Sequence, residues 1–378
     1  MTQFRLPATF PDAADFHARL QEIDPHFHCY EELGGGEGPL GQSLTWHGRQ
    51  LANRWAVHPM EGWDGTDDGM PSADTLRRWR RFGESGAKLI YGCEAMAVRP
   101  DGRANPNQLI ISDETKSDLN ELREILLEAH REQHGTSDDL AIGFQLTHSG
   151  RFCRPNGKFT YEPKIAYRHP ILDKKFMVKG DENLMTDDEV KELIEDFVRA
   201  ARVAKEVGAD FVDIKHCHGY LLHEFLGAYT RAGRYGGSFE NRTRILREIV
   251  EGIRADGNGI DLAVRLSTFD MVPFRPDPEK SQPDKLGPGI PEEHETPFPY
   301  QFGVNHEDPT QIDLKETFEF VNLCSELGIK LLNTSAGVPY YTPHLQRPAA
   351  YPPSDGYQSP YDPLVDVARQ INVVRDLK

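Results

Sequence analysis

Six short apolar segments alternate with amphipathic segments along this chain, and that alternation limits the fold more than any other feature. The apolar segments predict buried strands at 55–58, 87–95, 140–147, 209–214, 262–266 and 330–333. Apolar residues at helical spacing predict helices from about 72 and at 115–133, 186–207, 240–253, 314–327 and 363–378. Short strands without polar alternation, each followed by a helix, are typical of a parallel sheet covered by helices.

The connecting segments differ at the two ends of these strands. Those that follow strands are long, notably from about 151 to 185 and from about 268 to 311. Those that follow helices are short, such as Gly208-Ala209 and Gly328-Ile329. Long connections after the strands and short ones after the helices are typical of a TIM-type (β/α)8 barrel. In this α/β fold the active site lies at the end of the barrel where the strands have their carboxyl ends. A doubly wound sheet is the alternative, but HPMEGWDG after the first strand lacks that fold's glycine-rich phosphate turn.

The barrel expected here is incomplete. A TIM barrel needs eight strand–helix units, and six are found. We therefore expect residues 41–378 to form a partial barrel, after a polar N-terminal extension at 1–40. Residues 42–53 are expected to form a short hairpin ahead of the first strand.

Charge and cysteine content narrow the class of protein. The net charge of −17 argues against nucleic acid or an anionic membrane as a partner. No apolar run reaches the length of a membrane span, and the first residues lack the pattern of a signal peptide. Five scattered cysteines without a CxxC pair do not indicate a disulfide framework or an iron–sulfur cluster. We expect a cytoplasmic enzyme, for which a homo-oligomer is a compatible assembly.

The densest group of reactive side chains follows the fourth strand. Lys215, His216, His218 and Tyr220 stand within six residues. An HxH pair can hold zinc, as in a metal-dependent TIM-barrel hydrolase, but later strand ends offer few further ligands. The other interpretation of His216 is a hydrogen-bonded histidine in the layer between sheet and helices. Tyr220 is either a proton donor or a residue packed at a helix start.

Two polar residues lie inside otherwise apolar strands. Arg265 needs a partner, either Asp213 or Glu94 on another strand or an electron-rich ligand. Gln145 either links neighbouring strands or binds a flat polar ring, because a buried amide must be hydrogen-bonded.

Taken together, several segments resemble the old yellow enzyme family of FMN-dependent NAD(P)H oxidoreductases. The resemblance runs from about Gly38 to the C-terminus. Its segments, in family order, are NRWAVHPM at 53–60, EAMAVRPDGR at 94–103, QLTHSGR at 145–151, HGYLLHEFL at 218–226, RYGGSFENRTR at 234–244 and VRLS at 264–267.

The resemblance implies an FMN-dependent, ene-reductase-like enzyme. NAD(P)H gives a hydride to the flavin, which passes it to an activated alkene or a related small unsaturated substrate. The implied flavin-binding residues are Pro59, Met60, Glu61, Ala95, Gln145 and Arg265. Lys215 and His218 match the pair that binds the substrate carbonyl oxygen, and Tyr220 matches the proton donor; no resident metal is implied.

The chain departs from the family pattern in three respects. Lys215 stands where histidine is usual, and Glu61 where threonine or cysteine is common. The ammonium of Lys215 either favours an anionic substrate or is neutralised by Asp213. The third departure is length, because the loops after strands seven and eight bind the cofactor phosphate in such barrels. A C-terminally truncated flavoenzyme, with an inactive fragment as the extreme case, is therefore a further expectation.

Overall fold

The computed structural model describes residues 4–27, 29–32, 34–353 and 356–378. The chain divides into two compact units. One unit comprises Met1–Leu33, Leu266–Asn322 and Thr334–Lys378, and the other comprises Gly34–Arg265 and Leu323–Asn333. All nine residues predicted to form the site belong to the second unit.

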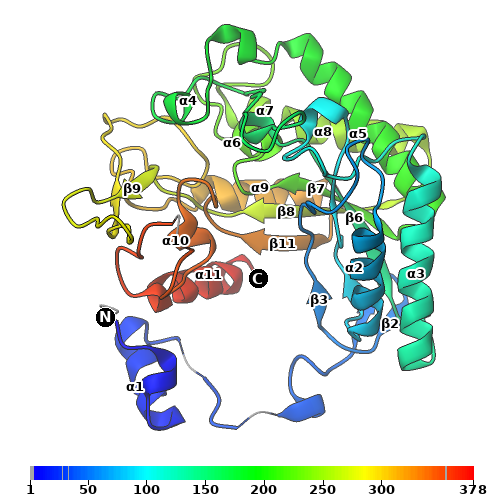
Figure 1. Ribbon diagram of the computed structural model, residues 1–378, viewed down its shortest axis with the longest axis horizontal. Coiled ribbons are helices and arrows are strands. Elements are labelled where there is room, and N and C mark those ends of the chain that lie inside the picture. The colour runs from blue at the N-terminus through cyan, green and yellow to red at the C-terminus, as the bar shows by residue number, and fades with distance from the viewer. Residues whose placement is uncertain (1–3, 28, 33, 354–355) are drawn as a thin grey trace. The chain divides into compact units, whose positions relative to one another are not determined.

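The elements follow the predicted alternation closely (Figure 1). The strands are β1 (Leu44–Trp46), β2 (Arg49–Leu51), β3 (Ala56–Val57), β4 (Leu89–Ile90), β5 (Ala95–Ala97), β6 (Ala141–Thr147), β7 (Phe211–His216), β8 (Asp261–Ser267), β9 (Phe274–Pro276), β10 (Gly289–Pro291) and β11 (Leu331–Ser335). The helices are α1 (Ala13–Ile23), α2 (Ala73–Glu84), α3 (Lys116–His134), α4 (Leu172–Lys175), α5 (Asp187–Val207), α6 (Leu221–Leu226), α7 (Phe239–Arg242), α8 (Arg244–Asp256), α9 (Lys315–Glu326), α10 (Pro343–Gln346) and α11 (Pro363–Leu377).

The main sheet confirms the predicted α/β architecture. Its strand order is β11-β8-β7-β6-β4-β3, with β5 paired to β6. The path follows the order of these strands along the chain, with β5 placed beside it and the hairpin of β9 and β10 outside it, as in a barrel wound in one direction. The pairs β3–β4, β4–β6, β5–β6 and β6–β7 are all parallel. The six predicted strands are therefore present, and the second of them is divided into β4 and β5.

Side-chain contacts show that this sheet curls. Arg265 in β8 donates to the carbonyl oxygen of Pro59, just after β3, at 3.3 Å. Tyr91, which follows β4, donates its hydroxyl to the carbonyl oxygen of Val264 in β8 at 3.1 Å. Because β3 and β8 are four strands apart, a flat sheet would separate them by about 19 Å. Contacts of about 3 Å require a half-barrel, so the fold expectation is confirmed in its six-stranded form.

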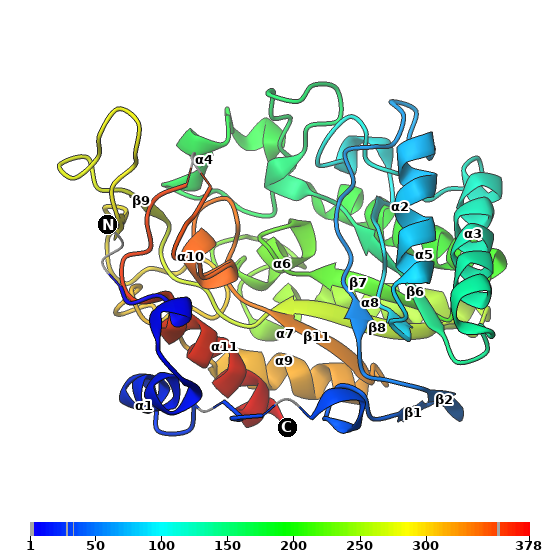
Figure 2. The same ribbon diagram turned by 60° about the horizontal axis from the view of Figure 1, so that its bottom comes forward.

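Helix ends in the second unit follow the sequence signals. Thr186 and Glu189 form the predicted capping box at the start of α5, and Gly208 ends that helix in the left-handed conformation with φ of 90°. Ser238 accepts from the backbone of Asn241 and caps α7. Figures 1 and 2 both show α2 and α3 side by side on the outside of the sheet.

Segments expected to be irregular contain regular structure. Residues 1–40 hold α1, where Arg19 donates to Asp362 beside α11 at 2.6 Å. The long segment after β8 folds into the antiparallel hairpin of β9 and β10. The predicted hairpin at 42–53 is confirmed by the antiparallel pair β1 and β2. Among the described residues, no helix has the length and apolar character needed to cross a membrane.

Candidate active site

The predicted site residues lie in neighbouring strands of the sheet or directly after them. Pro59, Met60 and Glu61 follow β3, and Ala95 begins β5. Ala95 pairs in register with Gln145 of β6, and Gln145 pairs with Asp213 of β7. These residues therefore form one level across the sheet. Met60 differs from the others because 61% of its surface is exposed.

A tight turn after β7 presents His218 and Tyr220. His218 has a φ of 62° and Gly219 a φ of 72°, so two successive residues adopt the left-handed conformation. This conformation is uncommon for a side-chain-bearing residue and often marks a functional turn. The Gly219 N–H donates to Nδ1 of His223 at 3.0 Å, and α6 begins directly after Tyr220. The sequence predicted a loop here, and α6 is an element that it missed.

Lys215 forms an ion pair with Glu61, and not with Asp213 as the sequence suggested. Its ammonium contacts Oε1 of the Glu61 carboxylate. The same nitrogen lies 3.6 Å from the centre of the Tyr220 ring, in cation–π geometry. The Lys215 side chain is 2% exposed and that of Glu61 is 18% exposed. The two substitutions that depart from the family pattern are thus in direct contact.

His218 lies near three other nitrogen bases or cations. Burial lowers the pKa of His218 well below its ordinary value, and the charges of Arg265, Lys215 and His223 lower it further. The imidazole is therefore neutral at pH 7. A neutral imidazole offers one N–H donor, which suits the binding of a carbonyl oxygen.

Asp213 fixes the orientation of Gln145. The amide nitrogen of Gln145 donates to Oδ2 of Asp213 at 2.5 Å, and both side chains are buried. This bond directs the amide NH2 toward β7 and leaves the amide oxygen on the other side. From the sequence, Asp213 was considered only as a counter-ion of Arg265 or Lys215. Its role as the hydrogen-bond partner of Gln145 was not predicted.

Arg265 has unused hydrogen-bonding capacity. Within the described part of the chain, the Arg265 guanidinium makes one hydrogen bond, to the carbonyl oxygen of Pro59, and its Nε is buried without a partner. Neither Asp213 nor Glu94 lies within ion-pair distance of it; Glu94 is bound by Arg78 instead. Of the two interpretations left open for Arg265, the structural salt bridge is therefore wrong. An electron-rich ligand would satisfy the buried donor.

A polar network that the sequence did not indicate holds the segment after β3. Arg78 of α2 donates to Glu94 at 2.6 Å and to both carboxylate oxygens of Asp64, at 2.7 and 2.8 Å. Glu94 also accepts from the Gly62 N–H at 2.6 Å. A side chain at Gly62 would collide with all three charged groups. The only sequence signal was the acidic Glu94 in an apolar strand.

The metal-dependent alternative gains no support from the described residues. The Nδ1–H of His216 donates to the carbonyl oxygen of Ile214 at 2.9 Å, and burial lowers the pKa of this histidine to about 4. Across residues 4–27, 29–32, 34–353 and 356–378, no group of three or more His, Cys, Asp or Glu side chains is placed to hold a metal ion.

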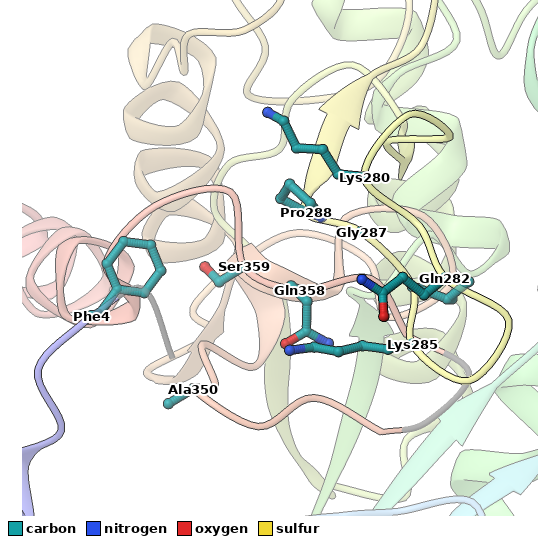
Figure 3. A pocket seen from close by; sticks show the side chains of 10 residues that line it. Phe4, Lys280, Gln282, Lys285, Gly287, Pro288, Ala350, Gln358 and Ser359 are labelled. Carbon is teal, nitrogen blue, oxygen red and sulfur yellow. The ribbon is translucent and has the colours of Figure 1, made fainter. Parts of the chain in front are cut away.

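Two surface pockets lie away from the predicted residues. One, of 210 Å³, is lined by residues of the first unit, and Figure 3 shows Gln282, Lys285 and Gln358 together in it. The other, of 240 Å³, includes Asp210 and Asp261 at the amino ends of β7 and β8. None of the nine predicted site residues lines either pocket, and the amino ends of barrel strands serve stability more often than catalysis.

Residues 42–277 match the model of the NADH:flavin oxidoreductase / NADH oxidase family. An NADPH dehydrogenase of Geobacillus sp. (strain WCH70) is 34% identical over 248 residues, which cover 63% of this chain and 65% of that relative. An NADPH dehydrogenase of Bacillus subtilis (strain 168) is 36% identical over 196 residues, 51% of this chain and 52% of the relative. The chain thus spans between about half and two thirds of the length of these relatives.

Solved structures agree on the fold. The Old Yellow Enzyme from Pichia sp. AKU4542 has a TM-score of 0.51 at 24% identity, covering 62% of this chain and 60% of that one. The old yellow enzyme homologue from Zymomonas mobilis has a TM-score of 0.54 at 22% identity, covering 79% of this chain and 74% of that one. These likenesses bear on the barrel architecture alone.

Proposed function

We propose that this chain, which belongs to the NADH:flavin oxidoreductase / NADH oxidase family, reduces an activated alkene with a hydride from NAD(P)H through FMN. The single observation that carries the proposal is the meeting of Lys215, near the end of β7, with His218 and Tyr220 in the turn that follows. A cation, a neutral imidazole and a phenol in one place suit a carbonyl compound that gains a hydride and a proton.

The residues beside this turn fit a flavin ring. FMN, when bound, supplies the hydride transfer. The buried Nε of Arg265 lacks a partner among the described residues and suits the electron-rich pyrimidine edge of the ring. Gln145, oriented by Asp213, presents its amide oxygen as an acceptor for a ring N–H. Ala95, which pairs in register with Gln145, is fully buried and has a small side chain. Pro59, Met60 and Glu61 follow β3 on the facing edge of the curled sheet.

These three residues divide two tasks between them. Lys215 and His218 donate hydrogen bonds to the substrate's carbonyl oxygen, which draws electron density from the conjugated double bond. Tyr220 gives the proton to the α-carbon. A phenol is a weak acid that can protonate a carbanion-like centre.

Tyr220→Phe separates the two half-reactions. We expect the variant to be reduced by NADPH at the wild-type rate, because the phenol takes no part in that step. Reoxidation by 2-cyclohexenone should slow by roughly 10² to 10⁴, the usual contribution of a general acid. Stopped-flow absorbance of the FMN-loaded chain measures both rates.

The matched control is Tyr235→Phe. Its hydroxyl donates to Glu248 at 2.6 Å and is not part of the site. This variant should keep both rates. If Tyr220→Phe also reoxidises at the wild-type rate, Tyr220 is not the proton donor. If neither NADPH nor NADH reduces the FMN-loaded wild-type chain, the proposed function itself is wrong.

A further inference from the structure

Lys215 and Glu61 form a charge pair at the position where the proposed reaction binds its substrate. The ammonium has three N–H donors. One is used by the Glu61 carboxylate, and the nitrogen also lies over the face of the Tyr220 ring at 3.6 Å. A donor therefore remains for a substrate oxygen, beside the neutral His218.

We propose that Glu61 is a built-in counter-ion that makes this anchor electrically neutral, so that the site selects uncharged activated alkenes over those that carry a carboxylate. The inference rests on the proposed function and specifies its substrate class. It assigns to Glu61 a role in specificity, in addition to the place beside the flavin that the resemblance implies.

Burial makes the counter-ion necessary. The Lys215 side chain is 2% exposed, and an ammonium removed from water needs a nearby anion to offset its lost hydration. Glu61 supplies that anion from within the protein. A neutral carbonyl oxygen then adds a hydrogen bond without changing the charge of the pair. A substrate carboxylate would place a second negative charge beside Glu61 or would have to displace it, and like charges at close range repel.

The neighbouring charges do not alter this balance. The buried carboxyl of Asp213 feels the charges of both Lys215 and Arg265, and the same two cations act on His218. His218 is neutral, because its pKa lies well below the ordinary value. The charges of Lys215, Arg265, Glu61 and Asp213 sum to zero when both carboxyls are ionised. Arg265 forms no ion pair among the described residues, but in the proposed function its buried donor is used by the flavin ring.

The backbone holds Glu61 in place on both sides. Met60, before it, bridges to Glu94 in parallel fashion, and its carbonyl oxygen accepts from the Ala95 N–H at 3.1 Å. Gly62, after it, donates to the Glu94 carboxylate at 2.6 Å. The backbone on both sides of Glu61 is thus held in place, and its carboxylate is paired with Lys215. A competing carboxylate would have to break that ion pair.

The test compares two ligands of nearly the same size, one charged and one neutral. Benzoate and benzamide have nearly the same shape and do not react, so calorimetric titration at pH 7.5 reports binding without turnover. The titrations are made with and without added FMN. The wild-type chain should bind benzamide at least as tightly as benzoate. Glu61→Gln should tighten benzoate binding at least tenfold and change benzamide binding less than threefold.

Two further variants separate local from global charge. Glu206→Gln removes one negative charge from an exposed ion pair, in which the Glu206 carboxylate lies 2.7 Å from the Lys116 ammonium. It should leave the affinities for benzoate and benzamide unchanged. Glu61→Gln/Lys215→Gln removes both charges of the site pair and should return the benzoate-to-benzamide ratio to the wild-type value. The double variant also leaves no unpaired buried ammonium, so it guards against failure of Glu61→Gln to fold.

Two outcomes overturn the inference. One is a wild-type chain that binds benzoate tenfold more tightly than benzamide. The other is an unchanged ratio in a folded Glu61→Gln variant. Either outcome is compatible with a chain that reduces alkenes, so neither would contradict the proposed function. Conversely, the predicted shift in the ratio would support the neutral anchor even in a chain that reduces no alkene.

Discussion

The buried carboxyl of Asp213 orients the Gln145 side chain, but its burial lowers the stability of the folded protein when the carboxyl is ionised. Burial raises its pKa to about 6, against the opposing effects of the Gln145 hydrogen bond and the Arg265 charge. The folded state therefore disfavours the ionised form. A carboxyl of this kind contributes stability below its unfolded pKa, near 4, and loses that contribution as the pH rises through about 6.

Asp213→Asn should remove this pH dependence while keeping an acceptor for Gln145. A pKa difference of about two units corresponds to about 3 kcal/mol at most. The variant should gain stability relative to the wild type between pH 4 and pH 6, with little further change above pH 7. Urea unfolding at a series of pH values measures the difference. A difference that stays constant between pH 4 and pH 6 would contradict the assignment.

At the scale of elements, the glycine in β6 makes room for its neighbour's ring. Gly143 pairs in register with Phe211 of β7. A methyl group at this position would overlap the Phe211 ring. That ring is enclosed by Tyr91 and Trp46, with ring centres 5.5 and 5.7 Å away. Phe211 therefore has no empty space into which it can move.

Gly143→Ala should destabilise the protein by about 1–3 kcal/mol, the usual effect of overpacking a core. Gly36→Ala is the matched control, because a methyl group there would meet no atom within 4 Å. It should change the free energy of unfolding by less than about 0.5 kcal/mol. Urea unfolding of the two variants tests the prediction. Equal effects would mean that Phe211 can repack.

Strands and capped helices were predictable from the sequence because their signals are local. The capping box at Thr186 and the left-handed Gly208 occur as expected. The break between β4 and β5 was not predicted, because it depends on a φ of 37° at Cys93, a side-chain-bearing residue. The pairing of Lys215 with Glu61 was also missed, because 154 residues separate them and only the curl of the sheet brings them together.

At the scale of the whole molecule, we expect binding of the flavin ring and binding of the cofactor phosphate to depend on different parts of the barrel. The residues proposed to contact the flavin ring are Pro59, Met60, Glu61, Ala95, Gln145 and Arg265, on or after β3, β5, β6 and β8. The path of the main sheet, within the described residues, has six strands. Barrels of this type commonly bind a cofactor phosphate with the loops after strands seven and eight.

The 378-residue polypeptide should therefore discriminate weakly between FMN and riboflavin, which share the ring and differ in the phosphate. Each charge-assisted phosphate contact contributes about 1.5–3 kcal/mol, so several such contacts would favour FMN by more than 10². Without them we expect dissociation constants within about threefold of each other, measured by quenching of flavin fluorescence. Arg265→Met should weaken both ligands by a similar factor, because it removes a ring contact. A preference for FMN above 10² would show that this polypeptide binds the phosphate through residues outside those two loops.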